Sequence, residues 1–446
     1  MLRTAQVPGV ECLDVHPIQG ELAAARYRLD NGLTVLLALD RRAPIFAYHT
    51  WIRVGSKHED PKQTGLAHLL EHLMFKATER FENGALDREM ELRGAQTNAA
   101  TWVDWTYYHQ TLAARGDNLR TVMTFEADRL ANLRFDRETF DSELEVVRNE
   151  RRMSVDDSAL GALGEAVYAT AFECHPYRTP TIGKGEHLEA TTLEQVREFY
   201  RAHYAPDQTV VVIAGDIDPQ ETLNLVVEHY GTLSPSGQKL PSLPPEPVQR
   251  EERRVELARP VNVPYVNVAY HIPGQLDPSF PSLEVASEVL FVGDNARLYR
   301  RLVTEERLAS DVEGYLTPFA EPGLCEVFVT LREEVHLERA VEIVQEELER
   351  LPETLTIEEL EKAKNGLELA YYEDLRDADG MAEALGHFEV AHNDYRRAFD
   401  GAARFQAVSQ DSVSAISRSV FQVENRTIGV LRPTDSSPEN ASDGDQ

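Results

Sequence analysis

His68-Leu69-Leu70-Glu71-His72 is the stretch that decides how the rest of this 446-residue chain is interpreted. Residues four apart lie on one face of an α-helix, so both imidazoles can reach a single metal ion. Imidazole suits zinc, and a catalytic zinc site needs three protein ligands and one open position for water. Glu71 lies near the same face and could accept a proton from that water. The pentapeptide therefore predicts metal-assisted hydrolysis, with peptide bonds as the expected target.

The pentapeptide is short, and two of 14 histidines could also stand four apart on the polar face of an ordinary amphipathic helix. The neighbouring residues favour the metal site. Apolar residues recur through this stretch at helical spacing: Leu66, Leu69, Leu70, Leu73 and Met74. The helix is therefore expected to pack on a core, with its histidines at the edge of the buried face. Polar groups held there need partners.

A third ligand must come from elsewhere in the chain. Glu150 is the best candidate, in a second predicted helix where Glu143 precedes it by seven residues and shares its face. The residues alone do not single out Glu150, because the chain has 76 acidic side chains.

In this pattern the chain resembles the inverzincin zinc peptidases of the pitrilysin and mitochondrial processing peptidase family, and within it the zinc-bearing subunit of the two-domain bacterial members. The third ligand of that family is a distant glutamate, and here 77 residues separate His72 from Glu150. The resemblance implies one zinc ion bound by His68, His72 and Glu150. It implies Glu71 and Glu143 as catalytic residues, the first as general base and the second as a carboxylate that steadies the site.

Other stretches match the family in the same order along the chain, from about residue 20 to about residue 432. The resemblance assigns one of them, Asn98, Ala99, Ala100 and Thr101, to a strand that borders the cleft. In the family the edge of that strand pairs with an extended substrate, which is β-augmentation. These four residues are therefore the expected substrate-binding residues.

Composition limits the possible partners and compartments. The net charge of −31 argues against binding to nucleic acid, because phosphate groups are bound by basic patches. The charge fits either a solvated surface or an acidic cleft that attracts basic peptides. No apolar run is long enough to span a membrane. The N-terminal residues lack the features of a secretory signal, so a cytoplasmic location is expected. Cys12, Cys174 and Cys325 are scattered and form neither a disulfide framework nor a cysteine metal site.

A proline-rich stretch divides the chain nearly in half, and the two sides read as divergent copies. The prediction is an N-terminal zinc-binding domain over residues 1–232, a linker over 233–250, a C-terminal domain over 251–433 and a disordered acidic tail over 434–446. The fold class is α+β, each domain being a mostly antiparallel sheet packed with helices. The resemblance implies that the two homologous domains form half of a clamshell.

The second copy has not kept the metal ligands. Aligning Leu73-Met74-Phe75 with Val289-Leu290-Phe291 sets Glu284, Ser287 and Glu288 opposite the two histidines and the glutamate of the first copy. Ala370 falls opposite Glu150. The C-terminal domain is therefore expected to be free of metal.

The chain also departs from the family pattern. Members with a complete site carry an arginine and a tyrosine where this chain has Val303 and Ser310. Neither residue can replace that pair in stabilising an oxyanion. We therefore expect a zinc endopeptidase that is the catalytic subunit of a heterodimer, whose homologous partner supplies the pair; a homodimer is the alternative. The rival hypothesis is a structural or assembly subunit that keeps the fold without the chemistry.

Overall fold

The structure is a computed structural model that describes residues 2, 5–19 and 22–434. It divides into two compact units, which are described separately. Unit 1 comprises Met1–Glu150, Thr179–Leu243 and Glu368–Arg404, and unit 2 comprises Arg151–Arg178, Pro244–Leu367 and Phe405–Gln446, each within the described residues.

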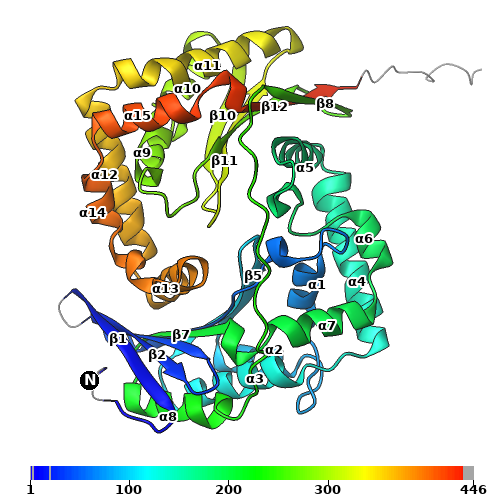
Figure 1. Cartoon of the computed structure of the whole chain (residues 1–446), viewed down its shortest axis with the longest axis vertical. Coiled ribbons are helices and arrows are strands. Elements are labelled where there is room, and N and C mark those ends of the chain that lie inside the picture. The colour runs from blue at the N-terminus through cyan, green and yellow to red at the C-terminus, as the bar shows by residue number, and fades with distance from the viewer. Residues whose placement is uncertain (1, 3–4, 20–21, 435–446) are drawn as a thin grey trace, which may run out of the picture. The chain divides into compact units, whose positions relative to one another are not determined.

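Unit 1 is built on a seven-stranded sheet in the order β1-β2-β3-β7-β4-β6-β5. Its strands are β1 (Val10–Gln19), β2 (Leu22–Leu29), β3 (Thr34–Leu39), β4 (Ile45–Ile52), β5 (Gln96–Thr101), β6 (Thr106–Ala113) and β7 (Thr209–Gly215). Strands β1, β2, β5 and β7 of this sheet are labelled in Figure 1. All neighbours are antiparallel except β3 and β7. The central strand β7 is apolar and buried along its whole length, as expected for a strand covered on both faces.

Helices cover the two faces of this sheet. They are α1 (Leu66–Leu73), α2 (Ala85–Arg93), α3 (Asn118–Asn132), α4 (Arg137–Arg151), α6 (Gly185–Ala190), α7 (Leu193–His203), α8 (Pro219–Tyr230) and α13 (Ala378–His392). Side chains alternate along β4: Phe46, Tyr48 and Ile52 belong to the core that also contains the leucines of α1. Ala47 and Trp51 belong to the core formed with α13. The two helices therefore lie on opposite faces of the sheet.

Unit 2 has a five-stranded sheet in the order β10-β11-β9-β12-β8. Its strands are β8 (Arg253–Arg259), β9 (Tyr265–Ile272), β10 (Ala309–Leu316), β11 (Gly323–Leu331) and β12 (Arg426–Pro433). Only β8 and β12 are parallel. The helices are α5 (Ala159–Ala171), α9 (Phe280–Phe291), α10 (Arg297–Tyr299), α11 (Leu337–Thr354), α12 (Ile357–Asp374), α14 (Gly401–Gln406) and α15 (Gln410–Val420). The end of α12 and the start of α14 belong to unit 1.

The two sheets share one topology. In unit 1 the last five strands stand in the order β3-β7-β4-β6-β5, and in unit 2 the order is β8-β12-β9-β11-β10. When these five strands are numbered by their position in the chain, both sheets show the same order of strands. The single parallel pair also stands at the same place in both. The predicted fold class, two related α+β halves with mostly antiparallel sheets, is confirmed.

The predicted domain boundaries are wrong in one respect. The division between the units does fall in the predicted linker, between Leu243 and Pro244, and residues 233–250 contain no helix or strand. However, each unit also includes a helix from the part of the chain assigned to the other domain: α13 belongs to unit 1 and α5 to unit 2. Each sheet has a second face that its own segment leaves uncovered, which a linear division of the sequence cannot reveal. The predicted tail, apart from Thr434, lies outside the described residues.

Several polar contacts fix α13 to its sheet. Glu389, whose side chain is buried, accepts hydrogen bonds from the guanidinium groups of Arg26 and Arg53. At Gly386 the helix backbone approaches the ring of Trp51 so closely that an added Cβ would lie 2.1 Å from the indole Nε1. The glycine therefore sets how closely α13 packs on the sheet.

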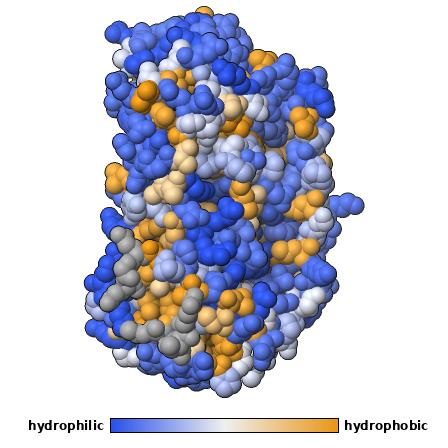
Figure 2. All heavy atoms as spheres, turned by 60° about the vertical axis from the view of Figure 1, so that its left-hand side comes forward, coloured by the Kyte–Doolittle hydropathy of each residue, from blue (hydrophilic) through white to orange (hydrophobic). Residues whose placement is uncertain are grey.

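Hydrophilic residues cover most of the face in view in Figure 2, interrupted by smaller apolar groups. No helix within the described part of the chain is long and apolar enough to cross a lipid bilayer.

Replacing Gly386 with alanine is expected to lower the free energy of unfolding by about 1–3 kcal/mol, because overpacking a buried contact outweighs the gain in helix propensity. The matched control is Gly164→Ala in α5, where an added Cβ meets nothing within 4 Å; it should be neutral or slightly stabilising. Urea unfolding followed by circular dichroism measures both. Equal midpoints for the two variants would contradict the close packing at Trp51.

Candidate metal centre

Helix α1 carries the two histidines and the glutamate of the pentapeptide. Leu66, Leu69, Leu70 and Leu73 are buried in the core of unit 1. His68, Glu71 and His72 are only partly buried, on the other side of the helix. The burial of the leucine face therefore orients the three polar side chains away from the sheet core.

The start of α1 is held by a carboxyl group that the sequence analysis did not identify. Both oxygens of Glu59 accept backbone hydrogen bonds, one from Gly65 at 2.8 Å and one from Ala67 at 2.7 Å. Carboxyl oxygens at a helix N-terminus satisfy free backbone N–H groups. Burial raises the pKa of Glu59 to about 8, and these backbone hydrogen bonds act in the opposite direction. Glu59 precedes the helix by seven residues, too far for the usual capping pattern, so only the folded chain shows its role.

Helix α4 brings Glu150 to the two histidines. His68 Nε2 lies 3.7 Å from one carboxylate oxygen of Glu150, and His72 Nε2 lies 3.5 Å from the other. One ligand atom from each of the three residues falls within 4.8 Å of the others. The residues predicted as metal ligands therefore converge at one place in unit 1.

These three residues fit a zinc ion. The two nitrogen–oxygen separations are at or beyond the limit of a hydrogen bond, yet they are close to the ligand–ligand spacing around an ion with bonds of about 2 Å. Burial lowers the pKa of His68 to about 4, and the neighbouring His72 acts in the same direction. The His68 imidazole is therefore neutral at pH 7, which is the form that binds a metal. Two imidazoles and a carboxylate are a ligand set typical of catalytic zinc.

Glu143 lies behind His72. One of its carboxylate oxygens is 3.7 Å from His72 Nδ1, and the other is 2.8 Å from the ammonium group of Lys76. The Glu143 side chain is only 12% exposed. Lys76, which follows α1 in the chain, neutralises this carboxylate and holds it toward the ring. Carboxylates in this position fix the orientation of a ligating histidine.

Glu71 is held by the strand predicted to bind substrate. The hydroxyl of Thr101, the last residue of β5, donates a hydrogen bond to Glu71 Oε2. Burial raises the pKa of Glu71, and the Thr101 hydroxyl acts in the opposite direction by stabilising the ionised form. The predicted general base and the predicted substrate strand are therefore in direct contact.

Strand β5 is an edge strand, paired with β6 on one side only among the described residues. Asn98 is exposed, while Ala99, Ala100 and Thr101 are half-buried. A free edge of this kind can add an extended peptide as a further strand. The four residues predicted to bind substrate thus stand where a peptide could lie next to Glu71.

The corresponding helices of unit 2 carry no such cluster. Helix α9 follows β9 as α1 follows β4, and it contains Glu284, Ser287 and Glu288. Ala370 lies in α12. The groups of the described chain that could hold a metal all lie in unit 1. Val303 and Ser310 stand in unit 2, in a short π-helix over Arg300–Glu305 and in β10.

Two family models match successive parts of the chain, and the boundary between them falls within unit 1. The family described as "Insulinase (Peptidase family M16)" matches residues 34–185, which include both ligand-bearing helices. The family described as "Peptidase M16 inactive domain" matches residues 190–367.

Similar proteins cover almost the whole chain. The "Zinc protease PqqE" of Helicobacter pylori is 26% identical over 411 residues, spanning 91% of this chain and 92% of that protein. The "Probable mitochondrial-processing peptidase subunit beta" of Schizosaccharomyces pombe is 28% identical over 374 residues and covers 80% of each chain. The crystal structure of a protease from Helicobacter pylori superposes with a TM-score of 0.88 at 25% identity, over 92% of this chain and 99% of that one. Because the two M16 matches together span most of the sequence, the chain belongs to peptidase family M16.

Proposed function

We propose that this chain is a zinc-dependent endopeptidase that cleaves extended peptides. The observation that carries the proposal is the convergence of His68, His72 and Glu150, with Glu71 beside them. A family member that had lost the chemistry would have no physical reason to keep three ligands and a base together. The names of its relatives, which are zinc proteases and a processing peptidase subunit, support the same activity.

In the proposed mechanism His68, His72 and Glu150 would hold a zinc ion, which would supply Lewis-acid polarisation of the scissile carbonyl and lower the pKa of a water molecule. Glu71 takes a proton from the attacking water and later gives it to the departing amine. Thr101 keeps the Glu71 carboxylate in place by its hydrogen bond. The edge of β5 aligns the peptide backbone beside this base.

The proposed enzyme also includes a homologous partner subunit. Val303 and Ser310 occupy the positions where family members with a complete site have arginine and tyrosine, so we infer that a homologous subunit supplies these groups. The Schizosaccharomyces pombe relative is itself named as a subunit, which supports a heterodimer. A homodimer is the alternative arrangement. The peptides accepted are expected to be unfolded or extended.

Replacing Glu71 with glutamine is expected to lower kcat/KM on a quenched peptide by about 10²–10⁴-fold, because general-base catalysis is lost. Bound zinc, measured by atomic emission, should remain stoichiometric, since all three ligands are intact. The matched control is Glu145→Gln on the exposed side of α4, which should retain full activity. Cleavage by the Glu71→Gln variant at the wild-type rate would favour a structural subunit or a contaminating protease.

Replacing Glu143 with glutamine is expected to weaken zinc binding by about 10–100-fold, because the carboxylate that orients His72 loses its charge and its ion pair with Lys76. Competition with a chromophoric chelator measures the affinity. An unchanged affinity would show that Glu143 does not act through the metal site.

Adding a homologous subunit that carries the arginine and tyrosine is expected to raise kcat/KM by about 100-fold over the isolated chain, since those groups stabilise the oxyanion. The same mixture prepared with the Glu71→Gln chain should stay inactive, which assigns the activity to this subunit. Full activity of the isolated chain as a monomer in sedimentation would contradict the need for a partner.

A further inference from the structure

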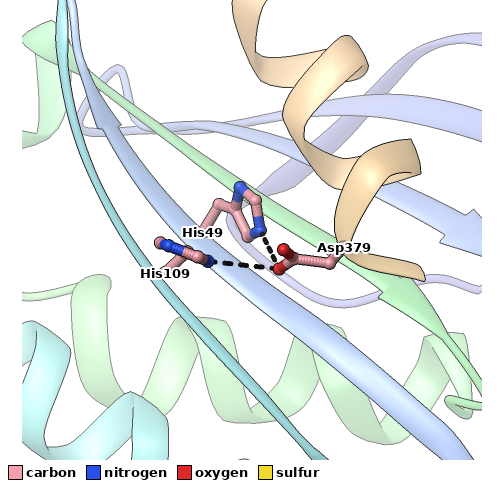
Figure 3. A group of neighbouring side chains, drawn as sticks. All are labelled: His49, His109 and Asp379. Atoms are coloured by element: carbon pink, nitrogen blue, oxygen red, sulfur yellow. Dashed lines mark hydrogen bonds and ion pairs between the residues drawn. The ribbon is translucent and has the colours of Figure 1, made fainter. Parts of the chain in front are cut away.

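A second group of potential metal ligands lies on the face of the unit 1 sheet that packs against α13. His49 on β4 and His109 on β6 share that face with Trp51 and Tyr107, and Asp379 stands in the first turn of α13 (Figure 3). Helix α1 and the first metal centre lie on the opposite face. This second group plays no part in the proposed peptidase mechanism.

The three side chains meet at a single oxygen atom. His49 Nε2 lies 3.0 Å and His109 Nδ1 lies 3.2 Å from Asp379 Oδ1, and all three atoms fall within 4.8 Å of one another. The hydroxyl of Thr111 donates to the same Oδ1 at 2.8 Å. Without an ion, and with a proton on His49 Nε2 and on His109 Nδ1, this one oxygen would accept three hydrogen bonds.

Three donors exceed what one carboxylate oxygen can accept well, because each oxygen has about two lone pairs. A shared cation removes the conflict. The two ring nitrogens and Oδ1 would then bind the ion, and Thr111 would be the only hydrogen-bond donor among the three. A donor behind a ligating carboxylate is the usual arrangement at metal sites, where it orients the ligand. Separations of 3.0–3.2 Å are also short enough for ligands of one ion with bonds of about 2 Å.

The ligands stand on rigid, well-packed elements. His49 and His109 are directly opposite each other in the antiparallel pair of β4 and β6, where facing side chains are neighbours. The His49 ring is fully buried and stacks on Trp51 and Tyr107. Asp379 belongs to a helix that Glu389 and Gly386 hold against this sheet. Binding an ion would therefore need little rearrangement.

The surroundings also suit a cation that arrives from solvent. The side chain of Asp379 is 37% exposed and that of His109 is 19% exposed, so one side of the group is open to water. Glu383, one helical turn after Asp379, interacts electrostatically with both of them and places a second carboxyl group beside the site.

We propose that His49, His109 and Asp379 form a second divalent metal site, with water completing the coordination. Two imidazoles and one carboxylate suit zinc and similar ions such as cobalt and nickel rather than calcium or magnesium. Because the ligands come from two strands and from α13, the ion stabilises unit 1 by joining that helix to its sheet. The site is independent of the peptidase mechanism.

The test is to titrate the metal-free chain with cobalt and to count the ions that it binds. Visible absorption and calorimetry measure the binding. Wild type is expected to bind two equivalents. His72→Gln, which disables the first centre, and His109→Gln, which disables the second, should each bind one, and the double variant none. Thr111→Val is the matched control, because it removes the hydrogen bond to Asp379 without removing a ligand, and it should still bind two.

The one equivalent retained by His109→Gln also reports that the variant is folded. Asp379→Asn, at a more exposed position, gives a second and milder disruption of the same site. In the His72→Gln chain, zinc at about 100 times its Kd should raise Tm by about 5 °C, and the added His109→Gln change should abolish the rise. Failure of the His72→Gln chain to bind an ion, or binding of two equivalents by both His109→Gln and Asp379→Asn, would overturn the proposal.

Discussion

The packing of α1 on the sheet of unit 1 is the constraint on which the candidate metal centre depends. Four buried leucines fix the rotation of this helix about its axis, and the carboxyl group of Glu59 holds its first turn. Only then do His68 and His72 face Glu150 on α4, with Glu71 beside them. Metal ligands must be placed to within a fraction of an ångström, so a site of this kind needs a rigid core behind it.

Around that core, polar contacts link the parts of the site. Thr101 joins the edge strand β5 to Glu71, and Lys76 joins α1 to Glu143. Each contact pairs a group that would act on the peptide or the metal with one that fixes its orientation. The edge of β5, Glu71 and the potential metal ligands are thus held as one arrangement.

The two units show how one topology can serve different purposes. Their five-stranded sheets correspond strand by strand, yet α9 and α12 present Ser287 and Ala370 where unit 1 has Glu71 and Glu150. The same topology therefore accommodates a cluster that could hold a metal in unit 1 and other residues on the corresponding helices of unit 2. Each sheet also buries its second face under a helix from the other half of the sequence, α13 in unit 1 and α5 in unit 2.

The sequence by itself determined the α+β class, the duplication, the early histidine-bearing helix and, through family resemblance, Glu150, because these depend on local periodicity and on motifs with a fixed spacing. It could not determine the exchange of α5 and α13, the role of Glu59, or the meeting of His49, His109 and Asp379. These depend on residues brought together across as many as 363 positions. Such contacts arise only when sheet faces are buried, and no pattern along the chain encodes which distant helix will cover them.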